Sequence, residues 1–171
     1  SWYCNLPVLL STEVRAHDKL FFWYTPGKYP ETEYPTAGVD DFKVFSGRPS
    51  LNPERRYHVL GLGFDKIRSH AICSVLDPEY LVCFYASPGT RSDYVERVER
   101  DNKDILSDAD QVFAVDMSDF AYAYSRIAGV VREFHQLGDV ILVPDGPKPL
   151  ILASSLVPMV LGHPGIVCFH V

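Results

Sequence analysis

Residues 140–154 read Val140-Ile-Leu-Val-Pro-Asp-Gly-Pro-Lys-Pro-Leu-Ile-Leu-Ala-Ser154, and this stretch decides the fold of the chain. A β-rich apolar run stops at a Pro-Asp-Gly triplet, and a helix-like apolar pattern begins after Pro149. The stretch therefore predicts a strand, a tight turn and the first turn of a helix. Backbone N–H groups in such a turn lie beside the positive end of a helix dipole, where anionic ligands bind in open α/β sheets. Lys148 adds a positive charge at this point.

The same strand-then-helix pattern repeats along the chain from Tyr57 onward. Apolar strands without alternation, separated by helices, indicate a parallel sheet that is covered on both faces. We therefore expect an α/β domain with a doubly wound, mostly parallel, five-stranded Rossmann-like sheet over residues 57–171. The expected strands are 58–64, 80–86, 111–115, 139–143 and 166–170, and the expected helices are 66–76, 93–106, 120–137 and 150–161.

Residues 1–56 have a different composition and predict an N-terminal β-rich extension or subdomain. Strand-like runs at 6–10 and 20–24 are followed by stretches rich in Pro, Gly, Tyr and Thr at 25–37 and around 47–53. The chain has 171 residues, of which 47% are hydrophobic, and that is enough for one substantial core. The sequence thus divides into an extension, 1–56, and a ligand-binding domain, 57–171.

The turns that follow parallel strands all lie along one edge of a sheet, so polar groups in these turns converge there. These groups could bind a ligand, but each also has a purely structural interpretation. The glycines could allow close strand-to-helix turns, Asp65 and Asp119 could cap helices, and residues 87–91 could be an ordinary polar loop. Asn102, on the helix expected at 93–106, is expected to face solvent. The candidate ligand-binding residues are Gly61, Gly63, Asp65, Ser87, Gly89, Arg91, Asp116, Asp145, Gly146 and Lys148.

Several common sites do not fit the sequence. Lys66 stands where a dinucleotide fingerprint needs its third glycine, and no acidic residue ends the second strand to hold a ribose. The chain contains no P-loop and no Gly-x-Ser-x-Gly motif, and His58 and His170 fall in strands, where packed imidazoles are usual. We therefore assign no catalytic residue, no metal ligand and no cofactor.

Composition narrows the choice of partners and compartment. A net charge of −6 argues against general binding to nucleic acid or to anionic membranes. No apolar run is long enough to span a bilayer. The four cysteines lack metal-ligand spacing, and three lie in apolar segments that are typical of reduced buried thiols. We expect a cytoplasmic protein.

The run from Val143 through Pro149 to Ala153 resembles the Rossmann-like CARF-type sensor domains of CRISPR-associated and related prokaryotic defence proteins. In these domains a Gly-rich turn followed by Lys-Pro opens the helix after a strand, and the likeness extends over about residues 57–171. The resemblance implies that Gly146 and Lys148 contact the phosphates of a cyclic oligonucleotide and that the domains pair as dimers. The chain departs from the pattern at two positions: Asp145 stands where glycine is usual, and Pro147 replaces Thr or Ser.

These observations lead to one preferred hypothesis and two others. The preferred one is a domain that senses a nucleotide or another phosphorylated ligand and acts through a homodimer or a separate effector domain or chain. The second is a small α/β hydrolase or nucleotide-processing enzyme that uses Asp116, Asp119 or Asp145 with Lys148 or a metal. The third is an interaction domain whose turns bind nothing.

Overall fold

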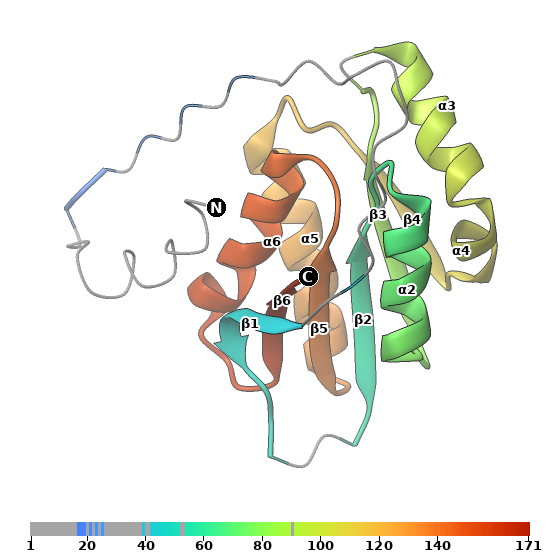
Figure 1. Cartoon of the computed structure of the whole chain (residues 1–171). Helices are drawn as coiled ribbons and strands as arrows, with labels where there is room; N and C mark the ends of the chain where they lie inside the picture. The colour runs from blue at the N-terminus through green and yellow to red at the C-terminus, as the bar shows by residue number, and fades with distance from the viewer. Residues whose placement is uncertain are drawn as a thin grey trace.

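A six-stranded sheet with the order β1-β6-β5-β2-β3-β4 forms the centre of the protein (Figure 1). The structure is a computed structural model that describes residues 17–19, 21, 23, 25, 39, 42–51, 54–89 and 91–171. The strands are β1 (Lys43–Arg48), β2 (Arg56–Gly61), β3 (Leu81–Ala86), β4 (Gln111–Val115), β5 (Asp139–Pro144) and β6 (Ile166–His170).

The sheet is mostly parallel, as the sequence predicts. β2 pairs in parallel with both β3 and β5, β3 pairs with β4, and β5 pairs with β6. Strands β2, β3 and β5 are almost wholly buried, which explains why their sequences are continuous apolar runs. The α/β class is therefore confirmed.

Two groups of helices cover the sheet, one on each face (Figure 1). On one face, α2 (Lys66–Leu76), α3 (Ser92–Asp101) and α4 (Lys103–Asp108) bury Ile72, Val98 and Ile105 against Leu60 and Cys83. On the other face, α5 (Phe120–His135) and α6 (Lys148–Leu161) pack on a second core that contains Phe84 and Leu142. No helix in the described part of the chain is long and apolar enough to cross a membrane.

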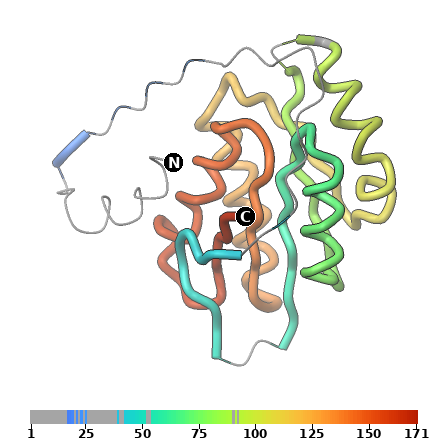
Figure 2. The backbone as a smooth tube through the Cα atoms, viewed as in Figure 1, coloured from blue at the N-terminus to red at the C-terminus, as the bar shows by residue number. Residues whose placement is uncertain are grey.

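The sixth strand corrects the expectation of five. β1 runs antiparallel to β6, with Lys43 opposite His170 and Arg48 opposite Ile166, and Figure 2 shows the two segments side by side. The sequence pattern missed β1 because this strand is exposed at four of its six residues and is interrupted by a register shift between Val44 and Ser46. Part of the segment assigned to the extension thus extends the sheet. The strand expected at 6–10, and most of the one expected at 20–24, lie outside the described residues.

A second correction concerns the helix expected over 93–106. It is divided into α3 and α4, with Asn102 at the junction, and Asn102 is fully buried where solvent exposure was expected. Its side-chain nitrogen lies 3.0 Å from the carbonyl oxygen of Gly63, in the turn between β2 and α2. The interruption therefore places an amide against the carboxyl edge of the sheet.

β1 docks through two close contacts. Gly47 has φ +79°, and a Cβ atom at this position would lie 2.1 Å from the Ile166 carbonyl oxygen and 2.7 Å from Pro158 Cβ. The Ser46 hydroxyl donates to the carbonyl of Ser155 in α6 at 2.7 Å, inside the protein. β1 is therefore fixed both to β6 and to α6.

We predict that Gly47→Ala destabilises the protein by about 2 to 5 kcal/mol, because an alanine there adds overpacking to the cost of left-handed backbone. Gly162→Ala is the matched control, since Gly162 has φ +67° and no atom within 4 Å of its Cβ position. The control should lose only about 1 to 2 kcal/mol. Urea unfolding of both variants measures the difference. Equal losses would contradict the docking of β1 on β6 and α6.

Candidate ligand site at the carboxyl edge of the sheet

The order of the parallel strands reverses between β2 and β5. From β2 the chain proceeds outward to β3 and β4, and then returns to β5 and β6 on the other side. In open α/β sheets, ligands bind beyond the carboxyl ends of the strands at such a switch point. Here the switch point lies between the turn after β2, residues 61–65, and the turn after β5, residues 144–148.

These two turns are in direct backbone contact. The N–H of Asp145 donates to the carbonyl of Gly61 at 3.1 Å. A Cβ atom on Gly63 would lie 3.1 Å from Gly146 Cα, and one on Gly146 would lie 2.8 Å from the Leu62 carbonyl oxygen. Glycine at 63 and 146 is thus explained by close packing of the two turns. Contact of the same residues with a ligand stays a prediction.

Arg68 and Asp145 form an ion pair across the switch point. Arg68 Nε, in the first turn of α2, lies 3.4 Å from Asp145 Oδ1, and the two side chains are 29% and 16% exposed. The guanidinium also donates to the carbonyl of Val171, the residue after β6. Burial raises the pKa of Asp145 to about 6, because desolvation of the carboxylate and repulsion by Asp65 outweigh the attraction of Arg68. The negative charge that Asp145 adds here is therefore easily neutralised.

The other acidic candidates hold local backbone structure. Asp65 accepts from the N–H of Arg68 at 3.0 Å and caps α2, and Asp119 caps α5 through the N–H of Tyr122 at 2.9 Å. Asp116 accepts from the N–H of Ser118, and hydrogen bonding to Ser118 lowers the pKa of this carboxyl. The capping interpretation of Asp65 and Asp119 is confirmed.

The loop after β3 is also engaged locally. The N–H of Ser87 donates to the Val115 carbonyl at 2.9 Å, and a Cβ on Gly89 would lie 3.0 Å from the Arg91 carbonyl oxygen. Arg91 pairs with Asp93 through two hydrogen bonds of 2.9 Å and lies over the Tyr94 ring. These contacts orient the Arg91 guanidinium along the start of α3.

The start of α6 differs from the starts of α2 and α5. Pro147 is its N-cap residue and makes no side-chain capping bond, and Pro149 has no N–H. Lys148 is the first helical residue and its side chain is exposed. The helix dipole and this ammonium group therefore place positive charge at the switch point.

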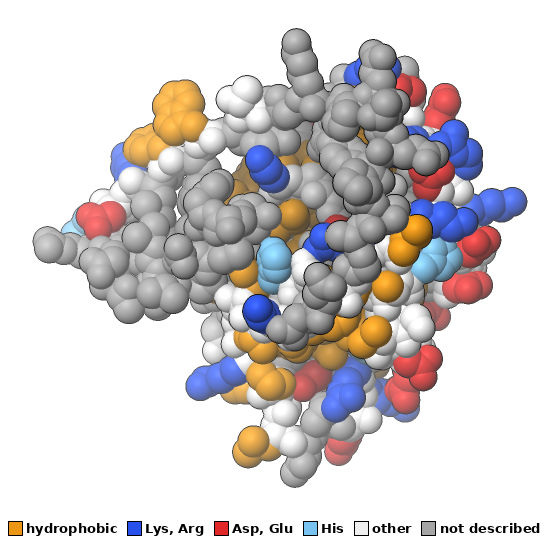
Figure 3. Space-filling view, in the orientation of Figure 1, with side chains coloured by type: hydrophobic (Ala, Val, Ile, Leu, Met, Phe, Trp, Pro, Cys, Tyr) orange, Lys and Arg blue, Asp and Glu red, His pale blue; other side chains and the backbone are white. Residues whose placement is uncertain are grey.

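Charged side chains of both signs surround the edge. In Figure 3, acidic side chains lie mainly on the side where α2, α3 and α4 lie, with several Lys and Arg side chains among them, and a few Lys and Arg side chains stand among apolar ones over the part of the face where β1 and α6 lie.

Other described parts of the protein give weaker candidates for a ligand site. A cavity of about 10 Å³ lies between α2 and the sheet, lined by apolar side chains and by His58. It has room for about one water molecule. Burial lowers the pKa of His58, as expected for an imidazole packed in a strand. Within the described ranges no three His, Cys, Asp or Glu side chains are grouped as they would be to hold a metal ion.

The predicted ligand-binding residues do not include two residues of this region, Arg68 and Asn102. Arg68 lies three positions after Asp65, the N-cap residue of α2. At this spacing the two residues are neighbours in the first turn of the helix. Asn102 stands in line with the apolar residues Val98 and Ile105, at helical spacings of four and three. A polar residue inside an apolar stripe indicates a buried hydrogen bond, and this pattern could have identified Asn102.

Comparison with known proteins gives no relative for this chain: no family model matches it, and no curated protein matches it. A functional proposal for this edge therefore depends on the chemistry of its residues.

We predict that Asp145→Asn stabilises the protein at pH 7.5 relative to the parent. The folded protein holds the Asp145 pKa at about 6, above the ordinary 3.8. The stability that this carboxyl contributes is therefore full below pH 3.8 and is lost as the pH rises through 6. The shift corresponds to at most about 3 kcal/mol. Thermal unfolding of both proteins from pH 4 to 8 should show the variant's advantage growing with pH.

The control for this titration is Asp116→Asn. Hydrogen bonding to Ser118 lowers the pKa of Asp116, so this carboxylate contributes stability above the ordinary pKa that is lost as the pH falls. Its replacement should change the pH dependence in the opposite sense and only in acid. A flat difference between Asp145→Asn and the parent over pH 4 to 8 would show that Asp145 is not desolvated.

Proposed function

We propose that residues 57–171 form a Rossmann-like, CARF-like domain that binds a nucleotide-type ligand, such as a cyclic oligonucleotide, at the switch point between β2 and β5. The domain senses this ligand in a prokaryotic defence or regulatory protein and acts through a two-fold homodimer or an attached effector. The observation that carries the proposal is the start of α6, where a helix without a side-chain cap and an exposed lysine adjoin two contacting glycine turns.

The chemistry of the edge supports a phosphate group better than a neutral ligand. The start of α6 contributes about half a positive charge and Lys148 a full one. The opposing carboxylate, Asp145, is paired with Arg68 at 3.4 Å, and its pKa of about 6 permits protonation when an anion approaches. The balance on the α6 side therefore favours an anion.

The enzymatic alternative has weaker support. Asp116 and Asp119 each accept a hydrogen bond from a backbone N–H of their own loop or helix. A general acid or base needs a carboxyl group that can reach a substrate proton. Asp145, with its raised pKa, remains the carboxyl best suited to that chemistry.

A thermal-shift panel tests the proposal. The protein is heated with mononucleotides, dinucleotides, cyclic dinucleotides and cyclic oligoadenylates, each with and without Mg²⁺. A ligand at 100 times its Kd adds about 2.7 kcal/mol of stability, which is readily detected. A shift with at least one phosphorylated compound is expected, and its absence across the panel would contradict the proposal. Light scattering on the same samples should show a dimer. A monomer at high protein concentration would contradict the proposed homodimer.

We predict that Lys148→Ala weakens binding of the panel ligand by about 10- to 150-fold, because a charge-assisted hydrogen bond contributes about 1.5 to 3 kcal/mol. The fold should persist, since an exposed lysine adds little to stability. Lys103→Ala is the matched control, because Lys103 is also exposed and is also the first residue of a helix, α4. Calorimetry should show parent-like affinity for the control. The same affinity in both variants would show that Lys148 does not contribute to ligand binding.

A further inference from the structure

Asn102 is a fully buried amide that joins the α3–α4 junction to the turn after β2. Its Nδ2 donates to the Val98 carbonyl at 2.9 Å and to the Gly63 carbonyl at 3.0 Å. Gly63 and Asn102 are far apart in the sequence, and this bond is a direct polar contact between the junction and the turn. It restrains the carbonyl of a residue at the switch point.

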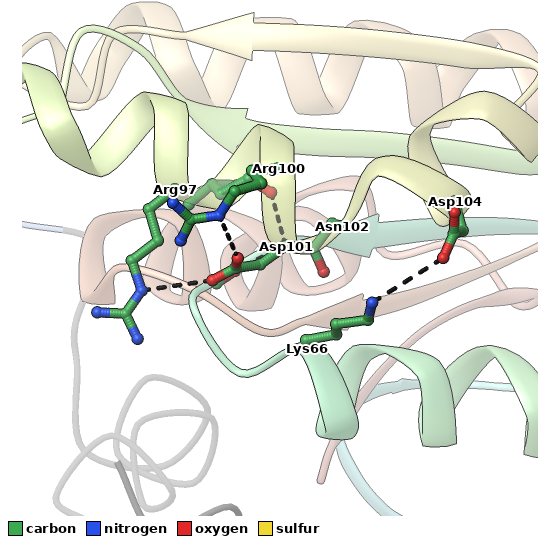
Figure 4. Close-up of polar contacts among 8 residues, drawn as sticks. Lys66, Arg97, Arg100, Asp101, Asn102 and Asp104 are labelled. Atoms are coloured by element: carbon green, nitrogen blue, oxygen red, sulfur yellow. Dashed lines mark hydrogen bonds and ion pairs between the residues drawn. The ribbon is translucent and has the colours of Figure 1, made fainter. Parts of the chain in front are cut away.

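Ion pairs hold the junction on either side of Asn102, as Figure 4 shows. Asp101 accepts from Arg97 at 3.4 Å and from Arg100 at 3.0 Å, and Lys66 of α2 lies 4.0 Å from Asp104 of α4. The Arg97 guanidinium also lies over the Phe64 ring, at 5.3 Å from its centre. The Asn102 amide thus projects from a helix junction that these contacts hold in place.

The position of Asn102 is unusual for what its side chain does. Asn102 is the N-cap residue of α4, where an asparagine normally accepts a bond from the helix backbone. Its side chain makes no such capping bond, and its buried Oδ1 has no hydrogen-bond partner among the described residues. The side chain therefore gives up a stabilising cap and leaves an acceptor unsatisfied while it holds the Gly63 carbonyl. A residue selected only for helix stability would not be arranged in this way.

The direction of the Gly63 carbonyl decides what a ligand meets at the turn. The peptide bond is planar and trans, so the carbonyl oxygen of Gly63 and the next N–H point in opposite directions. A peptide after glycine can rotate because glycine permits many backbone conformations. A rotated peptide would turn its carbonyl oxygen, which repels anions, away from the junction.

We infer that Asn102 is a positioning residue for anion binding: by holding the Gly63 carbonyl against the α3–α4 junction, it keeps this oxygen away from a phosphate bound at the switch point. The inference rests on the proposed function of the edge and extends it to a residue that does not touch the ligand. The ligand class is a phosphate or pyrophosphate group.

The test measures inorganic pyrophosphate binding by calorimetry at pH 7.5 with the full chain. Asn102→Ala and Asn102→Asp should each bind at least 10-fold more weakly than the parent, because the first loses the donor and the second replaces it with an acceptor. Ser46→Ala is the matched control, since it removes a buried side-chain bond to a carbonyl, at 2.7 Å, in the β1–α6 contact. The control should bind within twofold of the parent.

A second readout separates positioning from general loss of stability. Relaxation dispersion of the Gly63 and Phe64 amides should show new microsecond-to-millisecond exchange in Asn102→Ala and none in Ser46→Ala. If neither variant at 102 folds, hydrogen exchange of the Asn102 side-chain amide in the parent replaces them. Pyrophosphate should slow this exchange, and an unchanged rate would overturn the inference.

The outcomes distinguish the inference from the proposed function. Affinities of the Asn102 variants within twofold of Ser46→Ala would overturn the role of Asn102 alone. Nucleotide binding by a parent that ignores pyrophosphate would do the same. A parent that binds neither pyrophosphate nor any nucleotide would overturn the proposed function, and the inference with it.

Discussion

The backbone contact between the turns after β2 and β5 is the constraint on which the rest of this structure depends. The two strands pair in parallel along their full length, from Arg56 opposite Asp139 to Gly61 opposite Pro144. Both turns then leave the sheet at neighbouring points, and they approach so closely at Gly63 and Gly146 that a side chain there would be crowded. The glycines therefore allow the close contact that shapes the carboxyl edge at the centre of the sheet. Helices that leave these turns go to opposite faces, which forms the two cores.

The carboxyl of Asp145 is desolvated at this edge and is paired with Arg68. Burial of this carboxyl disfavours its charged form, and the nearby Arg68 offsets this cost only in part. An ion pair of this kind contributes little to stability compared with apolar packing. Protonation of Asp145 near pH 6 changes the local charge by one unit while the fold around it is held by the glycine turns.

The parallel part of the fold could be read from the sequence because its determinants are local. Each of the five parallel strands is mostly apolar, and the caps Asp65 and Asp119 mark the starts of two helices. β1 could not be read in this way, because its pairing depends on β6 and on the space that Gly47 leaves over Ile166. The candidate glycines were found by their position after strands. Arg68 and Asn102 were not, since their partners Val171 and Gly63 are distant in the sequence.

The pairing of β1 with β6 also constrains when this edge of the sheet can form during synthesis of the chain. β1 is synthesised before every other element of the sheet, yet its partner β6 is made after all of the described helices. A ribosome releases the chain from its N-terminus, so β1 must wait unpaired while the central strands assemble. Its exposed, irregular sequence suits a segment that has to stay soluble without a partner for this time. The β1–β6 edge of the sheet can therefore form only after β6 has been synthesised.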